Sequence, residues 1–376
     1  MTDLTKPHQF EMFVSHVIDK INERRKNSKF MLILKCLVML TSIAVSIYML
    51  YYFIKLTNPD TVTDTFKFEN TLKFKYIRSP NKKEDVMKIV YDLYRTDKWI
   101  KKYDTKMLLK RINESNFAYL LYGAPGTGKT IFIKEVAYKL DMILREKVFK
   151  EKDINTYNKI LDEINVEPSN ICGDESVMYA IYKNDLNENE NLIKNLENIS
   201  NQVRFISITP SSIYDKYVGE SSKNVRRLFN ALYSTGDKIT IAMFDEGDAL
   251  FRNRKLNLMQ NGQADVNVKS EFLTNLSQQL ISPKSVYTFV TTNHIYNIDD
   301  AFLRRLGHKV EFKMPNKDER REFITEVLGE LDITLDYAAS DLLARITEGC
   351  SYSFITKKIK SCLKFEEDKA ESATFE

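Results

Sequence analysis

The chain has 376 residues, of which 43% are hydrophobic, so it is long enough for one large or two moderate cores. Its 56 basic and 52 acidic residues leave a net charge of only +4, and this mixed balance argues against a nucleic-acid-binding protein. Four scattered cysteines and four scattered histidines show no metal-ligand spacing, and the cysteines give no disulfide framework, which favours a reducing compartment.

The N-terminal part predicts a membrane anchor. Residues 1–29 form a polar tail, and residues 30–54 are almost wholly apolar, interrupted by Lys35 and small hydroxyl residues. As a helix, this stretch would be roughly 37 Å long, enough to cross a hydrocarbon core of about 30 Å. A buried core helix and a cleaved signal peptide are the alternatives, but bulky aromatic residues stand where a signal would be cleaved. We therefore expect one transmembrane helix at 30–54.

A polar linker at residues 55–73 leads into the remainder of the chain. Residues 84–103 then have apolar side chains at helical spacing, which predicts an amphipathic helix packed on the core of the next domain. Residues 144–202 are rich in Asn, Lys, Glu and Asp, and we expect an insertion on the domain surface that is loosely ordered in part.

A phosphate-binding loop is the strongest signal in the sequence. Residues 123–130 read GAPGTGKT, between a predicted strand at 117–122 and a predicted helix from 131. The glycines allow backbone N–H groups to converge on phosphate oxygens, and the helix N-terminus adds its dipole. We expect Lys129 to reach the β and γ phosphates and Thr130 to ligate Mg²⁺, so the predicted cofactors are ATP and Mg²⁺.

Further strands are predicted at 203–208, 239–244 and 286–291, which indicates an α/β fold with a parallel sheet flanked by helices. Asp245 and Glu246 end the second of these strands, at the edge where parallel sheets bind ligands. We expect Asp245 to hold the magnesium ion and Glu246 to activate the attacking water. Asn293 follows the third strand, where an amide can position that water or sense the γ-phosphate.

The C-terminal part of the sequence has two further features. Arg304 and Arg305 are adjacent on an otherwise apolar predicted helix, where they form either an anion site or a solvated basic patch. From Asn316 onward the pattern is helical, and Asn316 with Glu319 predicts a helix cap. Residues 74–315 would thus form a large α/β domain and residues 316–376 a small helical lid.

In combination these segments resemble the AAA ATPases, in particular the branch of severing and disassembly machines with one AAA module. The resemblance covers approximately residues 74–362, apart from 144–202, and its marks are GAPGTGKT, FDEGDAL, YVGESSKNVRRLF, TTN and IDDAFLRRL. The segments SSIYDKYVGESSK and IDDAFLRRL, together with the predicted anchor, are most similar to the outer-mitochondrial-membrane AAA ATPase, which extracts mislocalised tail-anchored proteins. The resemblance implies a P-loop NTPase fold and a ring, usually a homo-hexamer.

The resemblance also implies a role for individual residues. Glu246 and Asn293 would be the catalytic base and first sensor, and Arg304 and Arg305 the arginine fingers that reach a neighbour's nucleotide. The first pore loop would be formed by Lys216, Tyr217 and Val218. ATP would be bound by Gly123, Ala124, Pro125, Gly126, Thr127, Gly128, Lys129, Thr130 and Asp245.

The sequence departs from the family pattern at several positions. Gly247 replaces a usual aliphatic residue, and Ala124 a usual proline. The segment 76–79 stands where the family has its adenine-side Asp-Ile-Gly-Gly, and Tyr352 and Phe354 replace a small residue and an acid near the second sensor. These departures concern the adenine pocket and the turnover rate, and they leave the hydrolytic residues in place.

We therefore expect a membrane-anchored ATPase that faces the cytosol and threads membrane proteins through a central pore, in the mitochondrial outer membrane or else in peroxisomes or the ER. One alternative is an ATPase that severs microtubules or disassembles ESCRT filaments. Another is a nucleotide-binding scaffold without turnover. An AAA protease is disfavoured, because the sequence has no H-E-x-x-H metal site.

Overall fold

The computed structural model describes Met12, Ser15 and residues 67–75, 77–80, 83–108, 117–163, 177–184, 190–214, 220–234, 238–252, 263–281 and 284–373. The chain divides into two compact units, 1–61 and 62–376, and the description below concerns the second. The predicted anchor at 30–54 lies outside the described residues. Within the part that is described, no helix has the length and apolarity needed to cross a bilayer.

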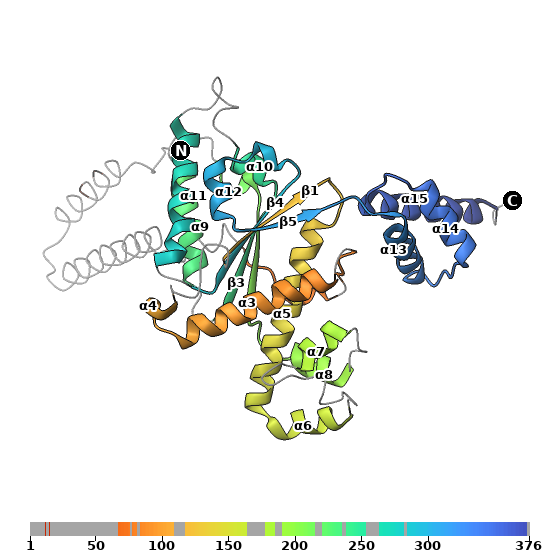
Figure 1. Cartoon of the computed structure of the whole chain (residues 1–376), viewed down its shortest axis with the longest axis horizontal. Helices are drawn as coiled ribbons and strands as arrows, with labels where there is room; N and C mark the ends of the chain where they lie inside the picture. Colours follow the sequence, from red (N-terminus) through yellow and green to blue (C-terminus); the bar gives the residue numbers. More distant parts are fainter. Residues whose placement is uncertain are drawn as a thin grey trace, which may run out of the picture. The chain divides into compact units, whose positions relative to one another are not determined.

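A five-stranded parallel sheet forms the centre of this unit (Figure 1), and pairing of its strands gives the order β2-β3-β4-β1-β5. The strands are β1 Ala118–Gly123, β2 Val203–Ile208, β3 Ile239–Phe244, β4 Val286–Thr292 and β5 His308–Phe312. Every residue of β3 and β4 is buried, as expected for strands covered on both faces. The predicted parallel α/β sheet is therefore confirmed.

Strand β5 is absent from our sequence predictions. It lies at the edge of the sheet, and only its last residue, Phe312, is buried. Its exposed positions carry Lys309 and Glu311, so the segment lacks the apolar run that identifies the central strands. A short edge strand of this kind gives little signal in a single sequence.

Helices cover both faces of the sheet. On one face, α3, α5, α7 and α8 share a hydrophobic core with Tyr119 and Leu121 of β1; on the other, α9, α10, α11 and α12 pack with Ala118 and Leu120. The helices of the first face are α3 Lys83–Lys102, α4 Thr105–Leu108, α5 Lys129–Lys152, α6 Ile154–Glu163, α7 Val177–Asn184 and α8 Glu190–Glu197. Those of the second are α9 Glu220–Tyr233, α10 Gly247–Leu250, α11 Gln263–Ile281 and α12 Asp300–Arg305.

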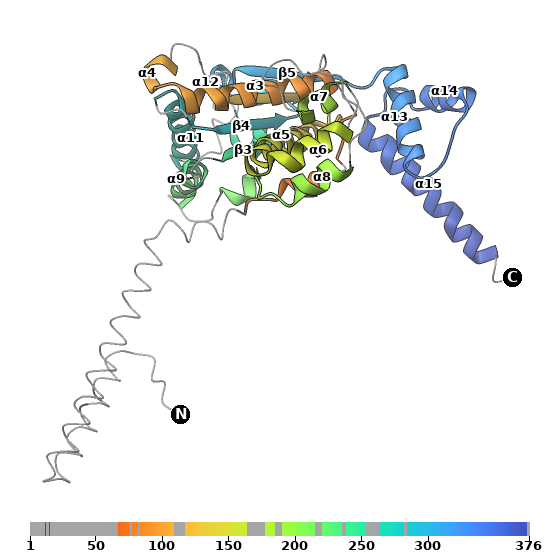
Figure 2. The ribbon, with the colours of Figure 1, turned by 90° about the horizontal axis from the view of Figure 1, so that it is seen from below.

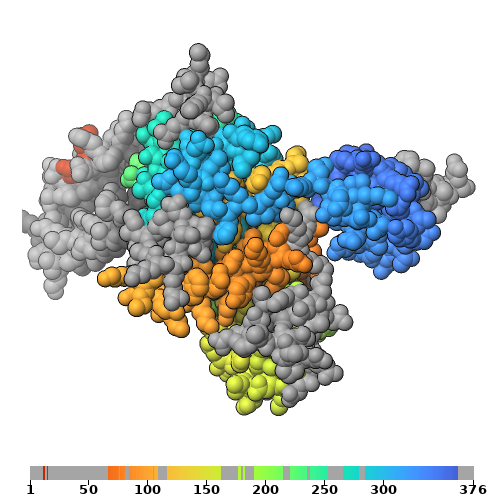
Figure 3. All heavy atoms as spheres, viewed as in Figure 1, coloured from red at the N-terminus to blue at the C-terminus, as the bar shows by residue number. Residues whose placement is uncertain are grey.

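In the segment 144–202, where we expect a surface insertion that is loosely ordered in part, the described residues are largely helical. Helix α5 continues through the start of this segment to Lys152, and α6, α7 and α8 cluster beside one half of α5 (Figure 1, Figure 2). Met178, Leu192 and Leu196 are fully buried in the core, whereas α6 reaches the surface (Figure 3). Each of these helices has at most ten residues, so its apolar face spans few positions among many polar ones.

A buried ion pair fastens this segment to α5. Both Arg145 and Asp141 have 0% of their side-chain surface exposed, and Arg145 Nε donates to Asp141 Oδ2 over 2.7 Å. The guanidinium also donates to four acceptors at the end of α8 and in the turn before β2, namely the carbonyls of Leu196, Glu197 and Ile199 and the side-chain oxygen of Asn201. Asp141 accepts three further hydrogen bonds, from Thr71 Oγ1 and from the backbone N–H groups of Gln202 and Val203. The network joins α5 to β2 and to the segment before α3.

Three helices, α13 Lys317–Gly329, α14 Tyr337–Ile346 and α15 Tyr352–Ala373, follow β5. They have a small core of their own around Ile324, Leu328 and Ile355. The predicted cap is confirmed as a complete capping box, in which Asn316 and Glu319 each accept the other's backbone N–H. These helices correspond to the predicted lid.

Candidate active site

The phosphate-binding loop runs from the end of β1 into the start of α5. Gly123 has φ +141°, and a Cβ atom there would lie 2.0 Å from the carbonyl oxygen of Phe312 in β5. Gly128, which caps α5, has φ +96°, in the left-handed region that side chains rarely adopt. Glycine is therefore required at both ends of the loop, as the phosphate-binding pattern predicts.

Lys129 is the first residue of α5, and its side chain is only 8% exposed. Its ammonium donates to the carbonyls of Gly123 and Ala124 and to Asn293 Oδ1, each over 2.8 Å. Burial lowers the pKa of Lys129, and the negative charges of Asp245 and Asp248 oppose this shift. The structure thus brings together the predicted phosphate-binding lysine and the predicted sensor.

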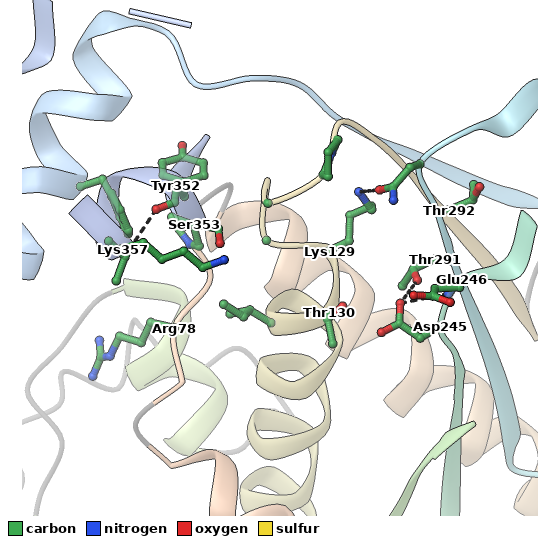
Figure 4. Close-up of a pocket in the computed structure, with 18 of the residues that line it drawn as sticks. Arg78, Lys129, Thr130, Asp245, Glu246, Thr291, Thr292, Tyr352, Ser353 and Lys357 are labelled. Atoms are coloured by element: carbon green, nitrogen blue, oxygen red, sulfur yellow. Dashed lines mark hydrogen bonds between the residues drawn. The ribbon is translucent and has the colours of Figure 1, made fainter. Parts of the chain in front are cut away.

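The acidic pair lies at the carboxyl end of β3, as predicted. Asp245 Oδ1 accepts hydrogen bonds from Thr291 Oγ1 and from the backbone N–H of Glu246. Glu246 has φ 54° and ψ 47°, a left-handed conformation that is uncommon for a residue with a side chain. The Asp245 carboxylate and the Thr130 hydroxyl are hard oxygen donors of the type that Mg²⁺ prefers, and both line the same cavity (Figure 4).

Gly247, one of the departures from the family pattern, has a steric explanation. A Cβ atom on this residue would lie 2.3 Å from Val290 Cγ1 and 3.1 Å from the Thr291 carbonyl oxygen. The backbone of α10 approaches β4 so closely that an aliphatic side chain does not fit here. The replacement therefore belongs to the local packing of α10 on β4.

A cavity of about 580 Å³ joins these residues. Its lining includes the phosphate loop, Asp245, Glu246 and Asn293, and on the other side Arg78, Pro80, Tyr352 and Lys357. Figure 4 shows Lys129 between these two groups of side chains. The lid also contacts the loop directly, because the Ser353 N–H donates to the Gly126 carbonyl over 3.1 Å.

Tyr352 closes part of the lid side of the cavity. It is 3% exposed and packs edge-to-face on Phe323, with ring centroids 4.7 Å apart. Burial raises the pKa of Tyr352, and the nearby Glu319 and Glu322 raise it further. A large aromatic ring thus occupies the place where the family has a small residue, whereas Phe354 is exposed.

The two predicted arginine fingers differ in their environment. Arg304 is exposed, and its Nε donates to the Asp300 carbonyl over 3.3 Å. Arg305 is half-buried and donates to Ser277 Oγ over 2.8 Å and to the Ala301 carbonyl over 3.0 Å. Neither lines the cavity of its own subunit. The predicted pore-loop residues Lys216, Tyr217 and Val218 lie outside the described residues.

Our sequence predictions missed the threonines that support the acidic residues. Thr291 donates to Asp245, and Thr292 donates to Asp248 over 3.0 Å while accepting the His294 N–H. Both threonines end β4, which pairs with β3, so the pairing brings them beside the carboxylates. The sequence TTN contains this signal, but it requires the strand register to be known.

Comparison with known proteins agrees with the site. The profile of the "ATPase family associated with various cellular activities (AAA)" matches residues 190–314, which include Asp245, Glu246, Asn293 and both arginines. Cell division protein C of Sulfolobus acidocaldarius is 30% identical over 156 residues, which are 40% of this chain and 40% of that protein. Probable spastin homolog spas-1 of Caenorhabditis briggsae is 30% identical over 40% of this chain and 27% of that protein.

Fidgetin-like protein 1 of Drosophila melanogaster is 28% identical over 40% of this chain and 28% of that protein. Among solved structures, a chain of the E. coli MS115-1 HORMA:CdnC:Trip13 complex has the same fold, with a TM-score of 0.51 and 17% identity over 80% of this chain and 88% of that chain. The match spans less than half the length of each of these curated relatives.

Residues 190–314 of this chain therefore match the AAA ATPase family. More particularly, the relatives to which it is similar include a probable spastin homolog and fidgetin-like protein 1. Homologues in this family hydrolyse ATP with Mg²⁺, and they typically assemble into oligomeric rings.

Proposed function

We propose that this chain hydrolyses ATP in a ring of identical subunits and uses the energy to pull on a polypeptide. One observation carries the hydrolytic part of the proposal. Lys129, Asp245, Glu246 and Asn293 come from three separate segments of the sequence, and all four line one cavity. We expect Lys129 to bind phosphate and Asp245 to hold the metal. We expect Glu246 to take a proton from water and Asn293 to position that water.

The residues of the site are suited to a triphosphate with its metal. The Lys129 ammonium is already oriented by three neutral oxygens, and phosphate oxygens can replace these acceptors. When bound by Asp245 and Thr130, Mg²⁺ would offset the negative charge that builds on the transferred phosphate. Glu246 is exposed at the cavity, where its carboxylate can accept a proton.

The position of Arg304 supports ring assembly. This arginine is exposed and lies away from its own subunit's cavity, so a neighbour's nucleotide is the anion it can serve. Its neighbour Arg305 is held by Ser277 and Ala301, which suits a role in orienting α12. We propose that Arg304 is the principal finger and that hydrolysis requires assembly.

The nature of the substrate has two candidate answers. The similarity to spastin and to fidgetin-like protein 1 supports the microtubule-severing or filament-disassembling type of function. Extraction of membrane proteins, with the ATPase facing the cytosol from the mitochondrial outer membrane, relies on the predicted anchor at 30–54. We favour the first, and we keep Lys216, Tyr217 and Val218 as the proposed pore loop in either case.

The test is a steady-state ATPase assay with Mg²⁺ on the full chain. Glu246→Gln should lower turnover on the order of 100-fold or more while nucleotide binding is retained, because only the proton acceptor is lost. Arg304→Ala should abolish turnover in the assembled protein, and a mixture with Glu246→Gln subunits should regain part of it. In the mixture, an Arg304→Ala subunit supplies Glu246 and a neighbouring Glu246→Gln subunit supplies Arg304, so both residues are present at the nucleotide between them. Full turnover by Glu246→Gln, or by a strictly monomeric sample, would contradict the proposal.

A second assay separates the two kinds of substrate. The full chain and a form without residues 30–54 are each incubated with microtubules and with liposomes that carry a tail-anchored protein. Severing by both forms, without extraction, is the result that we expect. Extraction that is lost on deleting 30–54 would instead favour the membrane function. Tyr217→Ala should reduce either activity more than it reduces basal hydrolysis.

A further inference from the structure

Residues 77–80 form one wall of the nucleotide cavity. Arg78 and Pro80 line it, and Pro80 Cδ lies 3.4 Å from the place where a Cβ atom of Gly128 would be. Figure 4 shows Arg78 on the side of the cavity away from Asp245 and Glu246. This segment therefore lies at the end of the cavity opposite to the predicted catalytic carboxylates, and it packs against the phosphate loop.

A buried glutamate holds this wall in place. Glu135, on α5, is 3% exposed, and its Oε2 accepts the backbone N–H of Ser79 over 2.6 Å. Its Oε1 accepts from Lys139 Nζ over 2.9 Å, and the Lys139 side chain is 14% exposed. The Lys139 ammonium lies 5.2 Å from the ring centroid of Tyr182, on α7. A chain of contacts thus runs from the segment 144–202 to the wall of the cavity.

The length of a nucleotide makes this wall important. When the phosphates are bound at Lys129 and Thr130, the ribose and base must extend toward the far end of the cavity. That end is lined by Arg78, Pro80 and Tyr352. The family's usual adenine-side segment is absent from this chain, so the backbone at 77–80 has to be positioned by other contacts.

We propose that Glu135 is a positioning residue that holds residues 77–80 against the phosphate loop and so sets the affinity for the base and ribose of the nucleotide. The proposal rests on the proposed function, in that it takes the cavity to bind ATP. Lys139 pairs with Glu135 and lies over the ring of Tyr182. Through these contacts, helix α7 would help to hold Glu135 and so contribute to nucleotide binding. A charged hydrogen bond that is shielded from water is stronger than a neutral exposed one, so its loss should be measurable.

The experiment compares two ligands, ATP and inorganic tripolyphosphate, on the full chain with Mg²⁺. Tripolyphosphate has the phosphates but lacks the base and ribose. Glu135→Ala should weaken ATP binding about tenfold and leave tripolyphosphate binding within about twofold, because only the ATP contacts at 77–80 are lost. Glu135→Gln keeps an acceptor for the Ser79 N–H and should recover most of the ATP affinity. The matched control is Glu190→Ala, whose i,i+4 lysine pair is exposed, with 87% of the Glu190 side chain accessible.

Three results would overturn the proposal. These are an unchanged ATP affinity in Glu135→Ala, an equal loss for both ligands, or a Glu135→Gln variant as weak as Glu135→Ala. If Glu135→Ala fails to fold by circular dichroism, Lys139→Met takes its place, with an expected loss of about threefold for ATP alone. An unchanged ATP affinity in that variant would also overturn the proposal. Failure of the unaltered chain to bind ATP would instead overturn the proposed function, and the unaltered sample shows this separately.

Discussion

Helix α5 carries a buried cation near each end, and the two cations have different partners. Lys129, at the start of the helix, donates to three neutral oxygens, and among the described residues it has no ion pair. Arg145, four turns later, is paired with the buried carboxylate of Asp141. Lys129 therefore keeps a net positive charge that a phosphate can neutralise, whereas the charge of Arg145 is already matched. The comparison teaches that the partner's charge, and not burial, separates a ligand-binding cation from a structural one.

The largest expected effect is at the first cation. Lys129→Ala should weaken ATP binding on the order of 1,000-fold, because the phosphates lose their charged donor in a partly water-excluded cavity. Thermal stability should fall little, since no carboxylate is left unpaired. Nucleotide titration and a melting curve measure the two effects. The control is Lys147→Ala, an exposed lysine on the same helix. Tight ATP binding by Lys129→Ala would contradict the comparison.

The second cation should give the opposite result. Arg145→Met leaves Asp141 buried without its counter-charge, and we expect a loss of about 3–5 kcal/mol in the free energy of unfolding. The folded protein should bind ATP as before. Denaturant unfolding gives the loss, and Arg345→Met is the control: it breaks an Asp–Arg pair of the same i,i+4 spacing, but Arg345 is 68% exposed. A loss of less than 1 kcal/mol in both variants would remove the distinction.

The next prediction concerns the packing of α10 on β4, at the end of the sheet that carries Asp245 and Glu246. Gly247→Ala places a methyl group 2.3 Å from Val290 Cγ1, so we expect a loss of about 1–3 kcal/mol in stability together with slower hydrolysis. Gly329→Ala is a suitable control, because nothing lies within 4 Å of the added carbon. Unchanged stability in Gly247→Ala would show that α10 moves easily on β4.

The smallest effect concerns one hydrogen bond of the structural network. Thr71→Val keeps the shape of the buried side chain but removes its 2.7 Å bond to Asp141 Oδ2. We expect a loss of about 1.5 kcal/mol, which is typical for a hydrogen bond to a charged group, with no change in ATP binding. Thr325→Val, at an exposed threonine, should change stability by much less. A loss of ATP affinity in Thr71→Val would contradict the separation between the two ends of α5.

The sequence predicted those parts of the fold that depend on local pattern. Strands β2 and β3 lie at the predicted residues, and the phosphate loop connects β1 to α5 as the spacing of its glycines requires. Asp245 and Glu246 could be placed at the ligand-binding edge because they end an apolar strand. In each case neighbouring residues along the chain carry the information, so no knowledge of distant contacts is needed.

Contacts between distant segments could not be predicted in this way. Arg145 contacts residues 196–201, and Glu135 contacts Ser79, only because the chain folds back on itself. The residues next to Arg145 or Glu135 in the sequence do not indicate these partners. The same holds for Thr291 beside Asp245, which depends on the pairing of β4 with β3. In 144–202, the helices α6, α7 and α8 are short and carry many polar residues on their outer faces. Their apolar faces were therefore difficult to recognise from the sequence.

The left-handed backbone of Glu246 has a consequence for how its carboxylate, the proposed catalytic base, is held. A conformation of this kind raises the energy of the native state on the order of 1 kcal/mol. Tight packing of Gly247 on β4 prevents the next peptide from rotating to relieve it. The direction of the side chain is thus imposed by the main chain and survives replacement by glutamine. Glu246→Gly should remove this backbone strain and raise the stability of the fold, but it should also abolish ATP hydrolysis. The chain thus has lower stability at this position, and in return the carboxylate has a fixed direction.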